Sequence, residues 1–131
     1  MPSNTAATNA RELPFHAMPY LRMRVTYEDQ NTVRPFLNQL PEGAQIAFTI
    51  VNIVEAFDGS ASLDVGTNAS SYDNIVDSTE IDETNAVSYH SFTGADLEFA
   101  ADTQAYVKLA ATNATQGEAI VVIVFVPDND L

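Results

Sequence analysis

The sequence predicts an all-β fold: an antiparallel β-sandwich, jelly-roll or immunoglobulin-like, preceded by an extended N-terminal arm. Seven or eight short apolar stretches recur at regular spacing, turn-forming residues separate them, and no long amphipathic helix is apparent. A chain of 131 residues can bury one substantial core but not two. We therefore expect an arm over residues 1–19 and a single sandwich domain over residues 20–131, with the strand order left open.

The arm begins with ten residues rich in Asn, Thr, Ala and Ser that show no periodicity. Pro14 and Pro19 then stiffen a segment that carries Phe15 and Met18, with Tyr20 just beyond it. Such an extended segment is suited to lying along another protein or over its own domain, and the sequence favours neither alternative.

Residues 20–28 alternate apolar and polar side chains, which predicts a strand with one buried face. Arg22 and Arg24 lie two residues apart and therefore share the solvent face. Because arginine forms bidentate pairs with carboxylates, they are candidates for a docking stripe. The alternative is that they only solubilise a sheet edge or neutralise the acidic body.

The stretch 45–66 is expected to be the centre of the fold. Apolar residues at period two predict a long strand buried on at least one face, with Ile46, Phe48, Ile50, Val54 and Ala56 in the series. Asn52 interrupts this pattern, which predicts a bulge or twist near it that exchanges the faces. The turn at residues 58–59 (Asp-Gly) should then reverse the chain into a strand over 62–65, forming a hairpin.

The other segments are shorter. Residues 31–42 indicate a single helical turn or an irregular crossing, 66–74 a loop and 75–76 a short apolar return, and strands are expected over 86–92, 96–100, 105–110 and 118–126. The last of these is apolar on both faces. In an antiparallel sheet this predicts a central strand, or one whose outer face another subunit covers.

An acidic connection at 77–85 holds Asp77, Glu80, Asp82 and Glu83, oxygen ligands of the kind that Ca²⁺ uses. The loop lacks the spaced ligands and fixed glycine of a calcium loop, so a solvated acidic loop is favoured. We predict no cofactor and no metal site.

The charge is strongly acidic and unevenly distributed. The formal net charge is -13, and residues 1–34 carry four arginines against three acids, whereas beyond them only Lys108 opposes 15 acids. Such a body repels nucleic acid and anionic membranes, so we expect neither as a partner. The chain has no cysteine, its first residues do not form a signal-peptide pattern, and its longest apolar run, 119–126, is too short to span a bilayer as a helix.

No catalytic constellation is present, so we predict that the chain is not an enzyme. His16 and His90 have no ligand spacing, no serine occupies a nucleophile elbow, and the adjacent acids Asp82 and Glu83 point apart. Tyr72, Tyr89 and Tyr106 are available for stacking sugars, but no aromatic stripe unites them, which favours an interpretation as core-edge tyrosines.

Two segments, residues 55–73 (EAFDGSASLDVGTNASSYD) and 114–126 (ATQGEAIVVIVFV), resemble a pattern in small structural proteins of tailed bacteriophages, the head decoration, cement and head-fibre proteins. The resemblance implies a β-sandwich on the capsid surface of a virion, often a homotrimer, assembled in the host bacterial cytoplasm. It also implies a decoration or cement function, in which the protein binds the major capsid protein and stabilises the shell by bridging capsomers.

For contact with the capsid or a neighbouring subunit we select Phe15, Met18, Tyr20, Arg22 and Arg24. The alternative function is a host-surface or glycan-binding module of a phage head fibre or tail.

Overall fold

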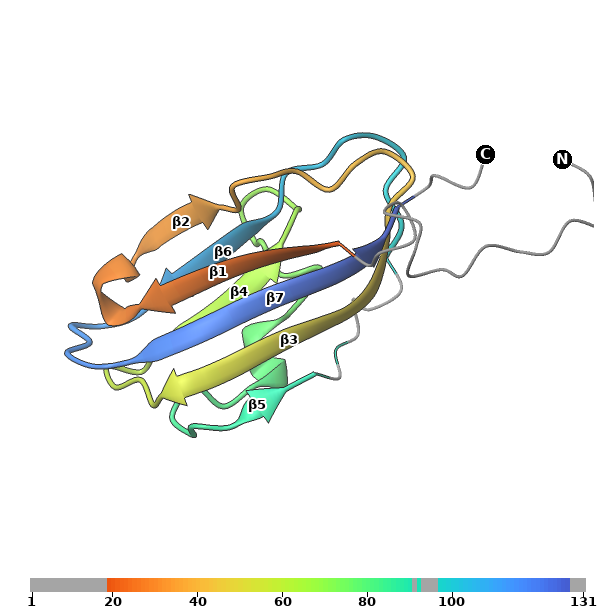
Figure 1. Cartoon of the computed structure of the whole chain (residues 1–131). Coiled ribbons are helices and arrows are strands. Elements are labelled where there is room, and N and C mark those ends of the chain that lie inside the picture. The colour runs from red at the N-terminus through yellow and green to blue at the C-terminus, as the bar shows by residue number, and fades with distance from the viewer. Residues whose placement is uncertain (1–18, 91, 93–96, 128–131) are drawn as a thin grey trace, which may run out of the picture.

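The computed structural model describes residues 19–90, 92 and 97–127, and these form a sandwich of two antiparallel sheets (Figure 1). The strands are β1 (Tyr20–Thr26), β2 (Thr32–Pro35), β3 (Gln45–Glu55), β4 (Ser62–Gly66), β5 (Ser88–Tyr89), β6 (Tyr106–Ala110) and β7 (Glu118–Val126). One sheet has the order β1-β7-β3-β5 and the other β2-β6-β4. Two short 3-10 helices, η3 (Tyr27–Asp29) and η4 (Ser78–Glu80), lie in connections. The predicted antiparallel β-sandwich is confirmed.

The strands pair in a nested order, in which the first strand of the chain pairs with the last. β1 pairs with β7, β2 with β6 and β3 with β5, while Val65 of β4 makes an isolated bridge to Val76. This is a long antiparallel hairpin rolled up so that successive strands enter different sheets, which is the jelly-roll arrangement. In an immunoglobulin-like sandwich the first two strands would be neighbours in one sheet. The strand order thus selects the jelly roll from the two predicted alternatives.

The hairpin expected over residues 45–66 is wrong, because β3 and β4 belong to different sheets. The turn exists, with positive φ at Gly59 and Ser60. However, it is bound to the loop that precedes β7: the Asp58 carboxylate accepts hydrogen bonds from the backbone N–H groups of Thr115 and Gln116. The chain therefore crosses the sandwich here instead of folding back on β3.

The buried face expected for β3 is also wrong over most of its length. The register with β7 shifts between Ile46 and Phe48, so one residue is inserted there and the faces exchange. Beyond this bulge Val51 is fully buried, whereas Phe48 and Val54 are exposed. A second register shift lies between Ile53 and Glu55, next to Asn52, so the irregularity predicted near Asn52 is present, whereas the one before Phe48 was not foreseen.

Other segments differ in extent from the prediction. Residues 31–42 contain β2, which was not expected to be a strand, and the strand predicted over 86–92 is limited to β5. The predicted strand over 96–100 contributes an isolated bridge between Gln45 and Glu98. The strand predicted over 118–126 coincides with β7, which is central as expected.

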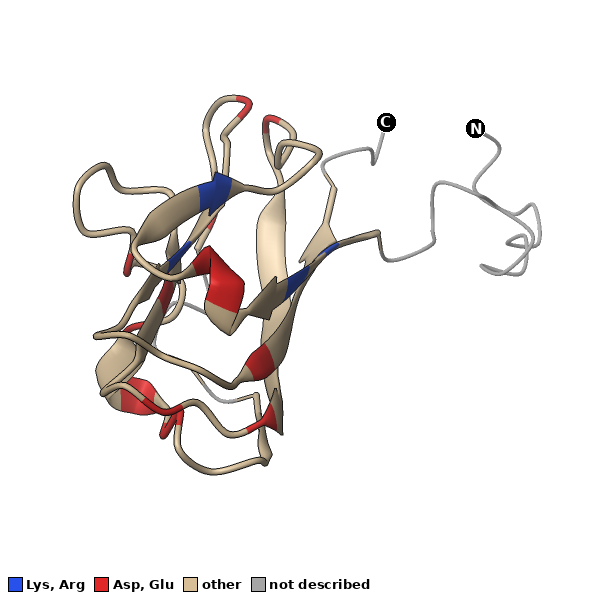
Figure 2. Cartoon of the chain, turned by 90° about the vertical axis from the view of Figure 1, so that its left-hand side faces the viewer, with Lys and Arg blue, Asp and Glu red and all other residues tan. Residues whose placement is uncertain are grey.

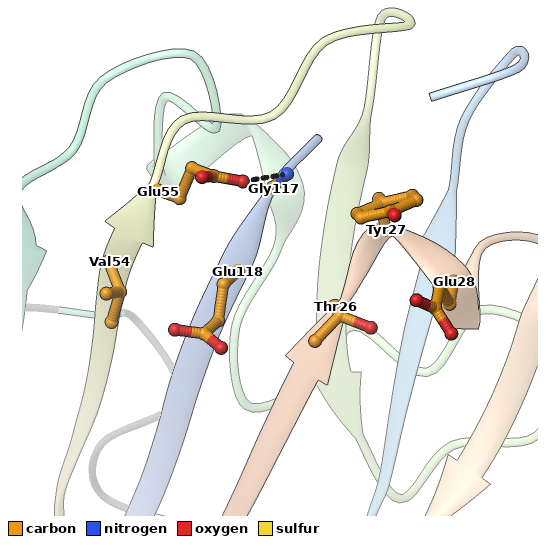
Figure 3. Close-up of a pocket in the computed structure, with 7 residues that line it drawn as sticks. All are labelled: Thr26, Tyr27, Glu28, Val54, Glu55, Gly117 and Glu118. Atoms are coloured by element: carbon orange, nitrogen blue, oxygen red, sulfur yellow. Dashed lines mark hydrogen bonds between the residues drawn. The ribbon is translucent and has the colours of Figure 1, made fainter. Parts of the chain in front are cut away.

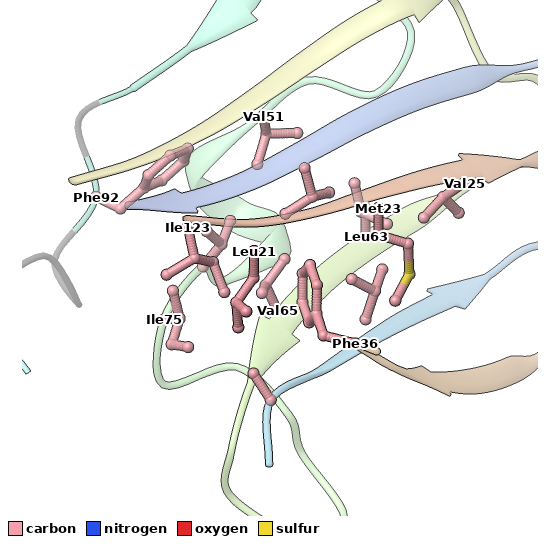
Figure 4. Packing of buried hydrophobic residues seen from close by; sticks show 14 of the residues in the cluster. Leu21, Met23, Val25, Phe36, Val51, Leu63, Val65, Ile75, Phe92 and Ile123 are labelled. Carbon is pink, nitrogen blue, oxygen red and sulfur yellow. The ribbon is translucent and has the colours of Figure 1, made fainter. Parts of the chain in front are cut away.

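The core lies between the two sheets (Figure 4). Val51 and Ile123 contribute from the four-stranded sheet, and Leu63 and Leu109 from the three-stranded one, all at most 1% exposed. Each such side chain contributes on the order of 1.5–3 kcal/mol by leaving water. Because the inner face of β7 supplies this core, its other apolar face points away from it.

Candidate functional site

The outer face, by which we mean the surface of the four-stranded sheet that points away from the core, brings together apolar side chains from three strands. The register aligns Tyr20 of β1, Val124 of β7 and Phe48 of β3 in one row, and Arg22, Val122 and Ile50 in the next. Large apolar side chains remain exposed on this face: Tyr20 at 62%, Phe48 at 40%, Val54 at 46% and Val126 at 48%. Several exposed large apolar side chains on one sheet face are typical of a protein contact site.

Two arginines border this apolar area along β1. Arg22 and Arg24 are exposed, and the Arg24 Nε lies 3.6 Å from Glu118 Oε1 on β7. Arg34 of β2 lies nearby and pairs with Asp29 at 3.1 Å between Nη1 and Oδ2. Lys108 is the fourth cation of the described residues, which are otherwise rich in carboxylates (Figure 2). The outer face therefore has an apolar centre and a basic border.

A pocket of about 370 Å³ lies at the end of the outer face where β1 leads into η3 (Figure 3). It is lined by Thr26, Tyr27, Glu28, Val54, Glu55, Gly117 and Glu118. The Glu55 carboxylate accepts a hydrogen bond from the Gly117 N–H at 2.8 Å. No three His, Cys, Asp or Glu side chains within the described part of the chain are arranged to hold a metal ion, so this pocket is an acidic surface hollow without metal-site geometry.

The acidic connection before β5 uses its carboxylates as hydrogen-bond acceptors. Asp77 caps η4 by accepting from the Thr79 N–H at 3.0 Å. Hydrogen bonds from the hydroxyl and then the N–H of Thr84 lower the pKa of Asp82. Glu83 is buried, and this burial raises the pKa of its carboxyl. The favoured solvated acidic loop is therefore wrong for Glu83, whose burial in the fold was not foreseen.

The tyrosines considered for sugar stacking do not form a platform. Tyr72 and Tyr106 pack edge to face, with ring centroids 5.1 Å apart and an interplanar angle of 62°. The Tyr89 hydroxyl lies 3.5 Å from the Asp82 carbonyl oxygen on a different part of the surface. Their packing matches the interpretation as core-edge residues.

Of the predicted contact residues, Tyr20, Arg22 and Arg24 lie together on β1, all on the outer face. Phe15 and Met18 lie outside the described residues. The sequence reasoning missed the part that β3 contributes, Phe48, Ile50 and Val54, since it assigned these side chains to the core. The sequence does contain an indication of this: Val51 and Ile53 form a second apolar series on the odd-numbered positions of the strand. Only one of the two series can face the core at a given point.

No family model matches the sequence, and no curated protein matches it. Two solved structures do have a similar fold. One is a chain of the Cyanophage Pam1 capsid asymmetric unit, with a TM-score of 0.62 and 18% identity, where the match covers 95% of this chain and 98% of the other. The second is a chain of the acidic stable capsid structure of Helicobacter pylori bacteriophage KHP30, with a TM-score of 0.61 and 13% identity, covering 83% and 89%. This chain therefore shares its jelly-roll fold with chains of phage capsid structures.

Proposed function

We propose that this chain is a virion structural protein of a bacteriophage, a decoration or cement protein that binds the outside of the capsid shell. The observation that carries the proposal is the exposed apolar centre of the outer face with its basic border. The fold shared with chains of two phage capsid structures supports it.

The two parts of the outer face suit two contacts. The apolar centre, formed by β7 and β3, is suited to self-association, here into a homotrimer. The basic border on β1 is suited to carboxylates of the major capsid protein. Because apolar contact contributes about 25 cal/mol per Å² buried, a modest area repeated over many copies would hold adjacent capsomers together. The chain would join the shell in the host bacterial cytoplasm.

The experiment is a binding assay with capsid shells assembled without this chain. The wild-type chain should sediment with the shells, and the double variant Arg22→Glu/Arg24→Glu should bind much more weakly while keeping its circular dichroism spectrum. Lys108→Glu is the matched control, since it reverses a charge on the three-stranded sheet and should leave binding unchanged. If wild type and double variant occupied the shells equally, the assignment of the basic border as the shell contact would be wrong.

The alternative is a host-surface or glycan-binding module on a head fibre or tail. The three tyrosines considered for sugar stacking do not favour it, because Tyr72 and Tyr106 pack on each other and Tyr89 lies elsewhere on the surface. Binding of the wild-type chain to cell-wall glycans on an array, without binding to shells, would select this alternative.

A further inference from the structure

β1 is an edge strand, and its hydrogen bonds show which backbone groups point away from the sheet. The Pro19 carbonyl accepts from the Phe125 N–H at 3.1 Å, and the Tyr27 N–H donates to the Gly117 carbonyl at 3.0 Å. Because these groups alternate in direction along an antiparallel strand, odd-numbered residues bond to β7. The N–H and C=O groups of the even-numbered residues within 20–26 therefore face the open edge.

The C-terminal half of this edge is capped. Arg34 Nη1 donates to the Arg24 carbonyl at 3.0 Å, and the Thr26 N–H donates to Asp29 Oδ2 at 3.0 Å. The N-terminal half is different: no described residue hydrogen-bonds to the N–H or C=O of Arg22. An uncapped stretch of edge strand is a template for pairing with another extended chain.

A hollow of about 110 Å³ adjoins this open stretch, lined by Tyr20, Leu21, Arg22, Phe36, Leu37 and Asn38. Leu37 is 97% exposed, although leucine side chains are favoured in protein interiors. A strand added next to β1 would direct every second side chain toward this hollow, so an apolar residue there would cover Leu37.

We infer that the open half of the β1 edge binds an extended segment of the shell protein as an added antiparallel strand that alternates acidic and apolar side chains. This inference rests on the proposed function and specifies its contact. In an antiparallel ladder, directly opposite residues point to the same face, so a carboxylate opposite Arg22 meets its guanidinium. The next residue of the segment points inward, to the hollow.

Charge selects the chemistry of this partner. Three of the four cations among the described residues lie along this side: Arg22, Arg24 and Arg34. Arg24 and Arg34 have carboxylate partners, whereas Arg22 forms no ion pair within the described part of the chain. An added strand with carboxylates on the outer face would pair with Arg22 and form charge-assisted hydrogen bonds.

Two occupants from this chain itself fit less well. Antiparallel pairing of two β1 strands about Arg22 would place the same arginine of both copies opposite each other, which is repulsive. In the arm, Glu12 and Pro14 fall on one face of an extended segment. If Glu12 paired with Arg22, its backbone groups would bond to β1, and so would those of Pro14, two residues further along. Proline has no N–H to donate at that position.

The test uses the full-length chain and shells assembled without it. Arg22→Pro removes the outward N–H but no hydrogen bond to β7, and an edge strand tolerates such a proline. Because this substitution also removes the guanidinium, Arg22→Ala, which removes the guanidinium alone, is measured beside it. Val33→Pro is the matched control. The Phe36 N–H donates to the Ala105 carbonyl, so even-numbered residues of β2 bond to β6 and the Val33 N–H faces the open edge of the other sheet. In addition, amide exchange of residues 20–24 is measured by mass spectrometry on the free and the shell-bound wild-type chain.

We expect Arg22→Pro to lose about tenfold or more in shell affinity relative to Arg22→Ala, and Val33→Pro to bind like the wild type. The outward-facing amides of Tyr20, Arg22 and Arg24 should be protected only on the shell, whereas those of Leu21 and Met23 already bond to β7 in the free chain. Equal binding of Arg22→Pro and Arg22→Ala would overturn the strand-addition inference and leave the proposed function standing. Protection of the outward-facing amides already in the free chain would overturn it too, by showing that the arm or a second copy occupies the edge. If the wild type does not bind shells at all, the proposed function fails and the inference fails with it. Should Arg22→Pro not fold, the exchange measurement on the wild type decides.

Discussion

The carboxylate of Glu83 accepts a hydrogen bond from the backbone N–H of Leu63 at 2.9 Å, and both residues are buried. The contact ties the acidic connection before β5 to β4 in the opposite sheet. The Glu83 carbonyl adds a second link, by accepting from the Phe57 N–H at 2.8 Å. A carboxylate that is 7% exposed in a chain of net charge -13 holds part of the sandwich together at an electrostatic cost.

The first prediction concerns the pH dependence of stability. Burial, with a smaller contribution from the nearby Asp64 charge, raises the folded-state pKa of Glu83 above its ordinary value. The folded state therefore holds this proton more tightly than the unfolded state does. The free energy of unfolding should decrease as the pH rises from the ordinary pKa through the raised one. Glu83→Gln keeps an acceptor for Leu63 and removes the ionisation, so it should increase stability at neutral pH and flatten this dependence in urea unfolding.

Asp82→Asn serves as the control for Glu83→Gln. The pKa of Asp82 is lowered, mainly by the Thr84 hydroxyl and then by its N–H, so its stabilising effect is present above the ordinary carboxyl pKa and is lost as the pH falls through the lowered one. The two variants should therefore change the pH profile in opposite directions. Parallel profiles would contradict the assignment of the buried charge to Glu83.

A second prediction follows from the buried hydroxyl of Thr49. This side chain faces the core at 1% exposure, and its Oγ1 has no hydrogen-bond partner among the described residues. Thr49→Val should raise the free energy of unfolding by about 1 kcal/mol, because it replaces an unsatisfied polar group with a methyl group of similar size. Thr115→Val is the opposite case, since its hydroxyl donates to Asp58 and its removal should destabilise. A loss of stability in Thr49→Val would show that the hydroxyl is satisfied in solution.

A third prediction concerns Gly117, just before β7. Its φ is +139°, and a Cβ at this position would overlap the ring of Phe57. Gly117→Ala should cost about 1–3 kcal/mol in the free energy of unfolding, from backbone strain and from the displaced ring. Combining it with Phe57→Leu should recover part of that cost, because the smaller side chain yields space. Strictly additive effects of the two substitutions would contradict the contact.

A fourth prediction addresses self-association through the apolar centre of the outer face. The double variant Phe48→Ser/Val126→Ser should be a monomer in light scattering, whereas the wild type should be the proposed trimer. The free energy of unfolding of the single chain should change by only about 0.5 kcal/mol, because both side chains are already solvent-exposed there. Leu37→Ser is the matched control, since it removes an exposed apolar side chain that is not on the outer face. A wild-type monomer would remove the self-association part of the proposal and leave shell binding to be tested alone.

Local patterns predicted much of this fold. Tyr20–Thr26 and Glu118–Val126 were foreseen because strict alternation and a dense apolar run are properties of single strands, readable without their neighbours. The same holds for Arg22 and Arg24, whose common face follows from their spacing of two. The turn at Asp58 and Gly59 was foreseen as well, because aspartate and glycine allow that backbone geometry in any context.

What the tertiary structure decided is where those elements pair and which faces they bury. A turn sequence states that the chain changes direction but not into which sheet it leads, so β4 was placed beside β3 although it pairs with β6. One inserted residue in β3 moves Phe48 and Val54 from the core to the surface, because strand side chains alternate with a period of two. The outer face, the open edge of β1 and the burial of Glu83 all depend on contacts between segments far apart in the chain, and no local pattern contains them.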